Sequence, residues 1–112
     1  MKYRTLGRTG LSVSQLGFGT MRLPMQDVNG ELRVNRELAI PLLQNAFQNG
    51  VTYIDSAVNY CNEDSQCAVG EALKGWRQSV VVSTAFSKTL AAPPEASRFF
   101  VADRSSWLST TT

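Results

Sequence analysis

The chain has 112 residues, of which 43% are hydrophobic and 18% charged, values typical of one soluble globular domain. The formal net charge of +2 is small and the basic residues are scattered, which argues against nucleic acid as a partner. No uninterrupted apolar run approaches the ~18–20 residues of a membrane span, and residues 1–5 lack the apolar core of a signal peptide. We therefore expect a cytoplasmic protein that binds no membrane.

The sequence contains two cysteines and no histidine. Cys61 and Cys67 are six positions apart, a spacing that fits no common zinc pattern, and too few other ligands are present to complete a four-ligand site. We expect two free thiols and no metal. The absence of histidine also removes the commonest general acid–base.

The first predicted elements are short strands. Two β-prone runs, residues 3–6 and 11–14, flank Gly7 and Gly10, a pattern typical of a tight hairpin. Residues 15–21 then predict a strand that runs into a loop. Its Gly-Phe-Gly step is no dinucleotide-binding fingerprint, because Arg22 stands where the third glycine should be.

A turn-rich loop is expected over residues 26–31, followed by a helix with Asn35 as its N-cap. Pro41 disfavours a regular helix interior, so the helix should either begin later than Asn35 or bend. Asn49-Gly50 should end it. The predicted apolar face of this helix consists of Leu38, Leu42, Leu43, Ala46 and Phe47.

The most informative stretch is residues 51–60. Residues 51–55 predict a buried strand with Asp55 at its carboxyl end, and Tyr60 follows in the next loop. In parallel α/β folds this edge is where ligand sites form, so an acid and a phenol here suggest proton chemistry. Two structural alternatives stand beside this interpretation: Asp55 as the cap of the next helix, and Tyr60 as a packing residue.

A second helix is predicted over residues 66–74, with Val69 and Leu73 on one face, and a third strand over residues 80–84. Strands that alternate with helices through short connections indicate βαβ units with a parallel sheet. The predicted class is therefore α/β: an N-terminal β-hairpin followed by βαβαβ.

Four stretches in this order resemble the aldo-keto reductases. They are Gly7-Arg8-Thr9-Gly10-Leu11, Leu16-Gly17-Phe18-Gly19-Thr20-Met21-Arg22, Gly50-Val51-Thr52-Tyr53-Ile54-Asp55-Ser56-Ala57 and Val69-Gly70-Glu71-Ala72-Leu73-Lys74. The resemblance implies that residues 1–84 form the first part of a (β/α)8 TIM barrel. It also implies an NADPH-dependent oxidoreductase that reduces small carbonyl substrates.

By this resemblance, Asp55 matches the family's catalytic aspartate and Tyr60 its tyrosine acid, while Thr20 and Met21 match positions beside the nicotinamide end of the cofactor. Gly19 is also expected to bind the cofactor, because a glycine at a strand end lets a ligand approach the backbone closely. Hydride arrival at a carbonyl carbon leaves negative charge on the oxygen, which a nearby tyrosine hydroxyl can protonate. The family places a lysine beside the phenol to make it a stronger acid, and the aspartate holds that lysine. A histidine from the next strand orients the carbonyl.

The resemblance ends at the position of the lysine, where this sequence has Ala85. Lys88, the nearest candidate, would lie roughly 10 Å further along a continued strand and on its opposite face. Residues 85–112 are expected to be an irregular, poorly ordered tail, apart from a turn of helix over residues 96–102. The abrupt change indicates a truncated or frame-shifted product, because a complete barrel needs ~250 residues.

Two functions follow as alternatives. One is a carbonyl reductase by descent that is inactive as this chain alone, and the other is a non-catalytic binding or oligomerising half-barrel. A partial barrel leaves sheet edges open, so self-association is also expected.

Overall fold

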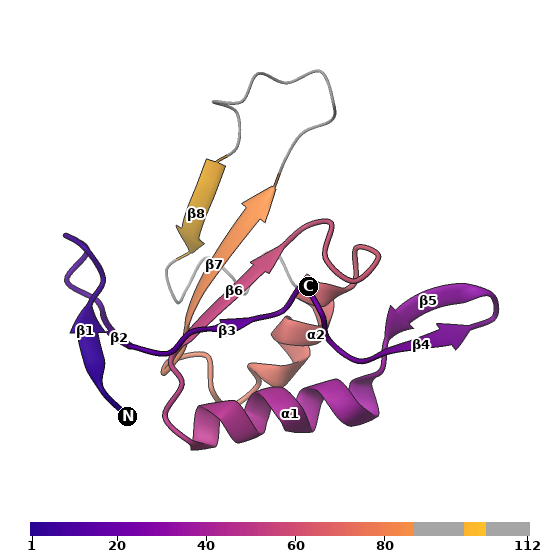
Figure 1. Ribbon diagram of the computed structural model, residues 1–112, viewed down its shortest axis with the longest axis horizontal. Coiled ribbons are helices and arrows are strands. Elements are labelled where there is room, and N and C mark those ends of the chain that lie inside the picture. The colour runs from indigo at the N-terminus through magenta and orange to yellow at the C-terminus, as the bar shows by residue number, and fades with distance from the viewer. Residues whose placement is uncertain (87–97, 103–112) are drawn as a thin grey trace.

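The computed structural model describes residues 1–86 and 98–102, and its centre is a four-stranded sheet (Figure 1). The strand order is β3-β6-β7-β8. The bounds are Phe18–Gly19 for β3, Tyr53–Ala57 for β6, Val81–Phe86 for β7 and Arg98–Ala102 for β8. Strands β3, β6 and β7 are parallel, with Phe18 opposite Ile54 and Tyr53 opposite Val81. The predicted α/β class and the parallel sheet are confirmed, and the three parallel strands follow one another in chain order.

The N-terminal hairpin is also confirmed. Strands β1 (Tyr3–Thr5) and β2 (Ser12–Ser14) pair antiparallel. Gly7 and Gly10 have φ values of 50° and 73°, a region that glycine adopts readily. The Tyr3 hydroxyl donates to the carbonyl of Gly50 at 3.1 Å, which ties the hairpin to the chain just before β6.

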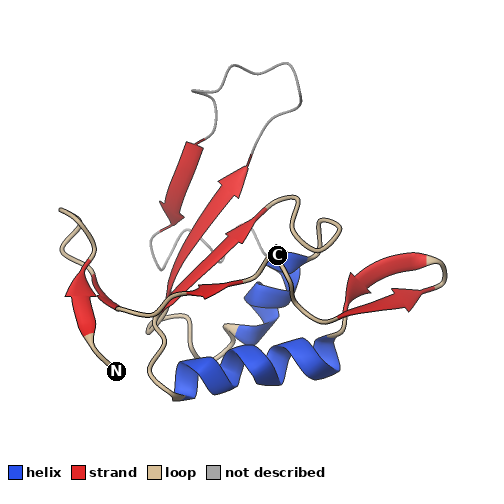
Figure 2. Cartoon of the chain, viewed as in Figure 1, coloured by secondary structure: helices blue, strands red, loops and turns tan. Residues whose placement is uncertain are grey.

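The loop predicted over residues 26–31 is wrong, because this region forms a second hairpin (Figure 2). Its strands are β4 (Met25–Val28) and β5 (Glu31–Val34). The turn residues Asn29 and Gly30 have φ values of 54° and 83°, as a two-residue hairpin turn requires. Asn-Gly between two extended runs is a known hairpin signal, and the turn-rich interpretation gave it too little weight.

Helix α1 covers Arg36–Gln48 as one continuous element (Figure 1). The Asn35 side chain accepts a hydrogen bond from the Leu38 amide at 3.3 Å, so the predicted N-cap is confirmed and a later start is excluded. Pro41 lies inside the helix at an exposed position. Lacking an N–H, it cannot donate to the Glu37 carbonyl one turn earlier.

The apolar face predicted for this helix is partly wrong. The buried positions are Ala39, Leu43 and Phe47, which are four apart and form one stripe. Leu38 and Leu42 are 58% and 43% exposed. Each lies one residue, or about 100° around the helix axis, from the buried stripe. Neighbouring leucines offered two possible stripes, and only packing against the sheet distinguishes them.

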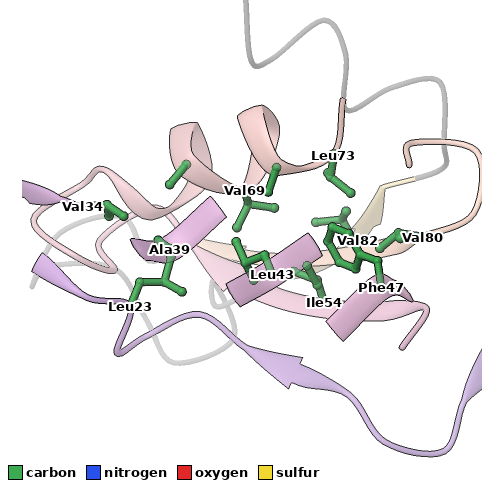
Figure 3. Close-up of a cluster of buried hydrophobic side chains, with 12 residues drawn as sticks. Leu23, Val34, Ala39, Leu43, Phe47, Ile54, Val69, Leu73, Val80 and Val82 are labelled. Carbon is green, nitrogen blue, oxygen red and sulfur yellow. The ribbon is translucent and has the colours of Figure 1, made fainter. Parts of the chain in front are cut away.

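Helix α2 covers Ser65–Ala72, and both helices pack on the same face of the sheet (Figure 3). Val69 and Leu73 are buried as predicted. The buried core consists of Leu23, Val34, Ala39, Leu43, Phe47, Ile54, Ala68, Val69, Ala72, Leu73, Val80 and Val82. Ile54 and Val82 belong to this face, so alternation along each strand places Asp55 and Ser83 on the other.

Strand β8 is a further departure from expectation. It pairs antiparallel with β7, with Ala85 opposite Phe99, so the turn of helix predicted over residues 96–102 is wrong. The stretch Phe99-Phe100-Val101 favours strand, and the outer edge of β7 offers backbone groups that need partners. The rest of the predicted irregular tail, residues 87–97 and 103–112, lies outside the described residues. Over the part that is described, no helix has the length and apolarity to cross a membrane.

Candidate strand-end site

The carboxyl ends of β3, β6 and β7 meet at one edge of the sheet (Figure 1). Gly19 is the last residue of β3, whereas Asp55 and Ser83 are each the third residue of β6 and β7, so the strand predicted to end at Asp55 in fact continues to Ala57. Gly19 is opposite Asp55, and Asp55 is opposite Ser83, so the three residues form one row across the strands near this edge. Residues in register on neighbouring strands present their side chains on the same face. The sheet therefore gathers a glycine, a carboxylate and a hydroxyl.

Asp55 is half-buried, and its Oδ1 accepts a hydrogen bond from the Ser83 Oγ at 2.6 Å. Its backbone carbonyl accepts from the Thr20 amide at 3.0 Å and from the Thr20 hydroxyl at 2.9 Å. The N-cap of α2 is Asp64, so the alternative of Asp55 as a helix cap is excluded. Sequence reasoning missed Ser83, which the strand register alone brings to Asp55.

Tyr60 lies in the turn after β6 and is half-buried. Its amide donates to the Ala57 carbonyl at 3.2 Å, and its carbonyl accepts from the Ser65 amide at 3.2 Å. Across residues 1–86 and 98–102, no hydrogen bond joins the side chains of Tyr60 and Asp55. The turn thus fixes the Tyr60 backbone.

The side chain of Thr20 belongs to the buried interior. It is fully buried, and its Oγ1 accepts from the Ser65 Oγ at 2.8 Å while donating to the Asp55 carbonyl. Ser65 Oγ lies 3.0 Å from the Oγ of Ser56, so buried hydroxyls join the ends of β3 and β6 to the start of α2. Both hydrogen bonds of the Thr20 hydroxyl are thus made within the protein, and the role of Thr20 beside a cofactor stays a prediction.

Gly19 and Met21 flank Thr20 and are both exposed. A Cβ added at Gly19 would meet no atom within 4 Å, and its backbone lies outside the left-handed region. Neither packing nor conformation requires glycine there, whereas close approach of a ligand would. Of the three predicted cofactor residues, Gly19 and Met21 are exposed, and Thr20 is buried.

Ala85 occupies the position at which the family resemblance places a lysine. It is opposite Ala57, two residues beyond the pair formed by Asp55 and Ser83, and so belongs to the face that carries Asp55. No ion pair to Asp55 occurs within the described part of the chain. Lys88 lies outside the described residues.

The loop after Tyr60 has an unusual backbone. Cys61, Asn62 and Glu63 have φ values of 55°, 56° and 66°, three consecutive non-glycine residues in the left-handed region. Such conformations cost roughly 1–2 kcal/mol per residue and persist only where surrounding contacts impose them. The Asn62 side-chain amide donates to the Leu32 carbonyl at 2.9 Å, and the Cys61 thiol donates to the Thr20 carbonyl at 3.4 Å.

Asp64 ends this loop, and its side chain does not cap α2. Its carboxylate instead forms a two-pronged ion pair with Arg36, with Oδ1 2.9 Å from Nη2 and Oδ2 bonded to Nη1, and Oδ2 accepts from the Val34 amide at 2.9 Å. The hydrogen bond from Arg36 holds the pKa of Asp64 below its usual range, with the Val34 amide and the Arg33 charge acting in the same direction. The same pair raises the pKa of Arg36.

Cys61 and Cys67 are free thiols, as predicted. Among the described residues there is no group of three or more Cys, Asp or Glu side chains suited to a metal ion. The site therefore consists of Asp55, Ser83 and Gly19 in one row, with Met21 beside it and Tyr60 in the following turn.

A parallel α/β sheet with this strand-end row is the first portion of a barrel of the kind seen in known reductases. The model of the Aldo/keto reductase family matches residues 15–104. The chain belongs to this family of oxidoreductases, whose members typically bind NAD(P)H and act on small molecules. The match extends twenty residues past residue 84, where the resemblance was predicted to end, and includes β8, so the predicted end of the resemblance is wrong.

Similar proteins agree with this assignment. A probable voltage-gated potassium channel subunit beta from Oryza sativa subsp. japonica is 40% identical over 87 residues, which are 75% of this chain and 25% of the relative. An aldo-keto reductase from Bacillus halodurans, solved in its holo form, superposes with a TM-score of 0.63 at 34% identity, over 75% of this chain and 25% of that one. A thermostable aldo-keto reductase in complex with the inhibitor epalrestat gives 0.60 at 29% identity, over 77% and 31%. The chain thus spans between a quarter and a third of the length of these relatives.

Proposed function

We propose that this chain carries part of the active site of an NADPH-dependent carbonyl reductase and that the chain alone does not catalyse the reaction. The observation that carries the proposal is the row Gly19, Asp55 and Ser83 at the carboxyl edge of the parallel sheet. Ser83 orients the Asp55 carboxylate, and open space above Gly19 leaves room for a flat ring to approach the backbone. Family membership supports the assignment.

In this proposal each residue has a distinct task. NADPH, when bound, supplies a hydride to the carbonyl carbon of a small aldehyde or ketone. Gly19 and Met21 border the reactive end of that cofactor. The Tyr60 hydroxyl donates a proton to the substrate oxygen as negative charge develops there. Asp55, fixed by Ser83, is placed to hold a cationic side chain at position 85, where this chain has a methyl group instead.

The isolated chain should show no NADPH-dependent reduction of a reactive aldehyde. Position 85 carries no charge to strengthen the acidity of a phenol, and the sequence contains no histidine to orient the carbonyl. Positioned proton transfer is typically worth ~10²–10⁴ in rate, and it acts only once the reactants are held together. The assay follows NADPH absorbance, with Tyr60→Phe as its control. Turnover above that control would contradict the prediction.

A chimera tests the roles of the residues directly. Residues 15–84 replace the matching segment of the Bacillus halodurans relative, so that the recipient supplies the residue at position 85 and the remainder of the barrel. The chimera should reduce aldehydes, and Tyr60→Phe should lower kcat/KM by about 10²–10⁴. Extending the graft by one residue to include Ala85 should lower kcat/KM by a similar factor. Leu38→Met, a nearly isosteric change at a position on α1 that is 58% exposed, is the matched control.

The alternative is a non-catalytic binding or oligomerising module. It predicts a folded chimera in which Tyr60→Phe and wild type have equal activity, together with self-association of the isolated chain. In the sheet the outer edge of β7 is paired with β8, which leaves β3 and β8 as the edge strands among those described. Self-association through these edges stays a prediction.

A further inference from the structure

We propose that Asp64 and Ser65 position Tyr60 by holding the loop of residues 60–64 to four other elements. This inference rests on the proposed role of Tyr60 as the proton donor. Asp64 and Ser65 are adjacent and buried, at 3% and 0% exposure, where the loop meets α2. They are positioning residues, since they act on Tyr60 only through the backbone.

Asp64 connects the loop to the last residue of β5 and to the first residue of α1. Its carboxylate accepts the Val34 amide at 2.9 Å, and Val34 is the last residue of β5. The two-pronged pair with Arg36 joins it to the first residue of α1. Arg36 Nε also donates to Glu71 at 2.8 Å, which anchors the guanidinium to α2. These contacts fix Asp64 in position and orientation.

Ser65 connects the other side. Its hydroxyl donates to Thr20 at the end of β3 and lies 3.0 Å from the Ser56 hydroxyl on β6. Its amide donates to the Tyr60 carbonyl at 3.2 Å. One residue therefore links the Tyr60 backbone to the two strands that carry Gly19 and Asp55.

The loop from Tyr60 to Asp64 cannot relax independently of these contacts. Cys61, Asn62 and Glu63 are all left-handed, so the chain from Tyr60 to Asp64 has a conformation that free L-residues avoid. Cys61 and Asn62 are held to Thr20 and Leu32 by hydrogen bonds. Release of Asp64 should therefore let these residues return to extended or right-handed conformations and move the Tyr60 ring.

Fluorine NMR on the full chain labelled with 3-fluorotyrosine tests this inference. The chain contains three tyrosines, at positions 3, 53 and 60, and Tyr60→Phe identifies the resonance of Tyr60. In Asp64→Asn we expect that resonance to shift toward its position in the urea-denatured chain, while those of Tyr3 and Tyr53 stay in place. An unmoved Tyr60 resonance in the folded variant would overturn the inference.

Two further variants separate positioning from general stability. Phe47→Leu loosens the core at the far end of α1 and should lower the melting temperature without moving the Tyr60 resonance. Arg36→Lys keeps the charge but not the two-pronged geometry, and should move the resonance part of the way. If Asp64→Asn does not fold, Arg36→Lys decides the matter, and no movement there overturns the inference. The readout needs no turnover, so it is independent of the chimera's activity.

Discussion

Leu43→Ala should lower the free energy of unfolding by about 2–5 kcal/mol. Leu43 is fully buried at the centre of the stripe that α1 presents to the sheet and α2 (Figure 3). Its removal would take apolar surface out of contact with this core and leave a cavity that rigid strands cannot close. Urea unfolding followed by far-ultraviolet circular dichroism measures the change. If Leu43→Ala is already unfolded without urea, it has lost at least the whole free energy of unfolding of the wild-type chain.

Leu42→Ala is the matched control, since it makes the same change at the next position of the same helix. Leu42 is 43% exposed, so truncation should alter the free energy of unfolding by less than about 1 kcal/mol, helped by the better helix propensity of alanine. If Leu43→Ala and Leu42→Ala lowered the free energy of unfolding equally, the buried stripe would be contradicted and the broader apolar face expected from periodicity would be supported.

Asp64→Asn should lower the free energy of unfolding by about 3 kcal/mol near neutral pH, because it leaves Arg36 without its buried partner. Arg36 holds the pKa of Asp64 below its unfolded value, so the folded state binds fewer protons and gains stability above the unfolded pKa. This contribution is lost as pH falls through the lowered folded pKa. The free energies of unfolding of wild type and Asp64→Asn should therefore converge in acid, starting below about pH 4 and approaching each other further as the pH falls.

Urea titrations at neutral pH and in acid measure that convergence. Glu71→Gln is the matched control, because Glu71 also pairs with Arg36 but its side chain is 45% exposed. A solvated pair of this kind is worth about 0–1 kcal/mol, so its loss should be small at every pH. A difference between wild type and Asp64→Asn that stayed constant down to the acid end would show that packing, and not the charge of Asp64, makes the contribution.

The local chemistry of the chain determined much of the fold. Asn35 begins α1 because its side chain can accept an amide hydrogen bond, and Gly7 and Gly10 allow the first turn. Alternating strand and helix patterns give β6, α2 and β7 in parallel register. Asp55 and Tyr60 are accessible to sequence reasoning for the same reason, since one lies in β6 and the other in the turn that follows it.

Only the tertiary structure decided features that depend on which distant residues meet. Leu42 and Leu43 are equivalent as sequence, and contact with the sheet buries one of them. The register of β6 with β7 brings Ser83 to Asp55, and packing of α1 beside α2 brings Arg36 to Asp64. Each pair is separated by 28 residues. Periodicity reports the face of one element, whereas these contacts depend on how two elements are placed, which no local pattern encodes.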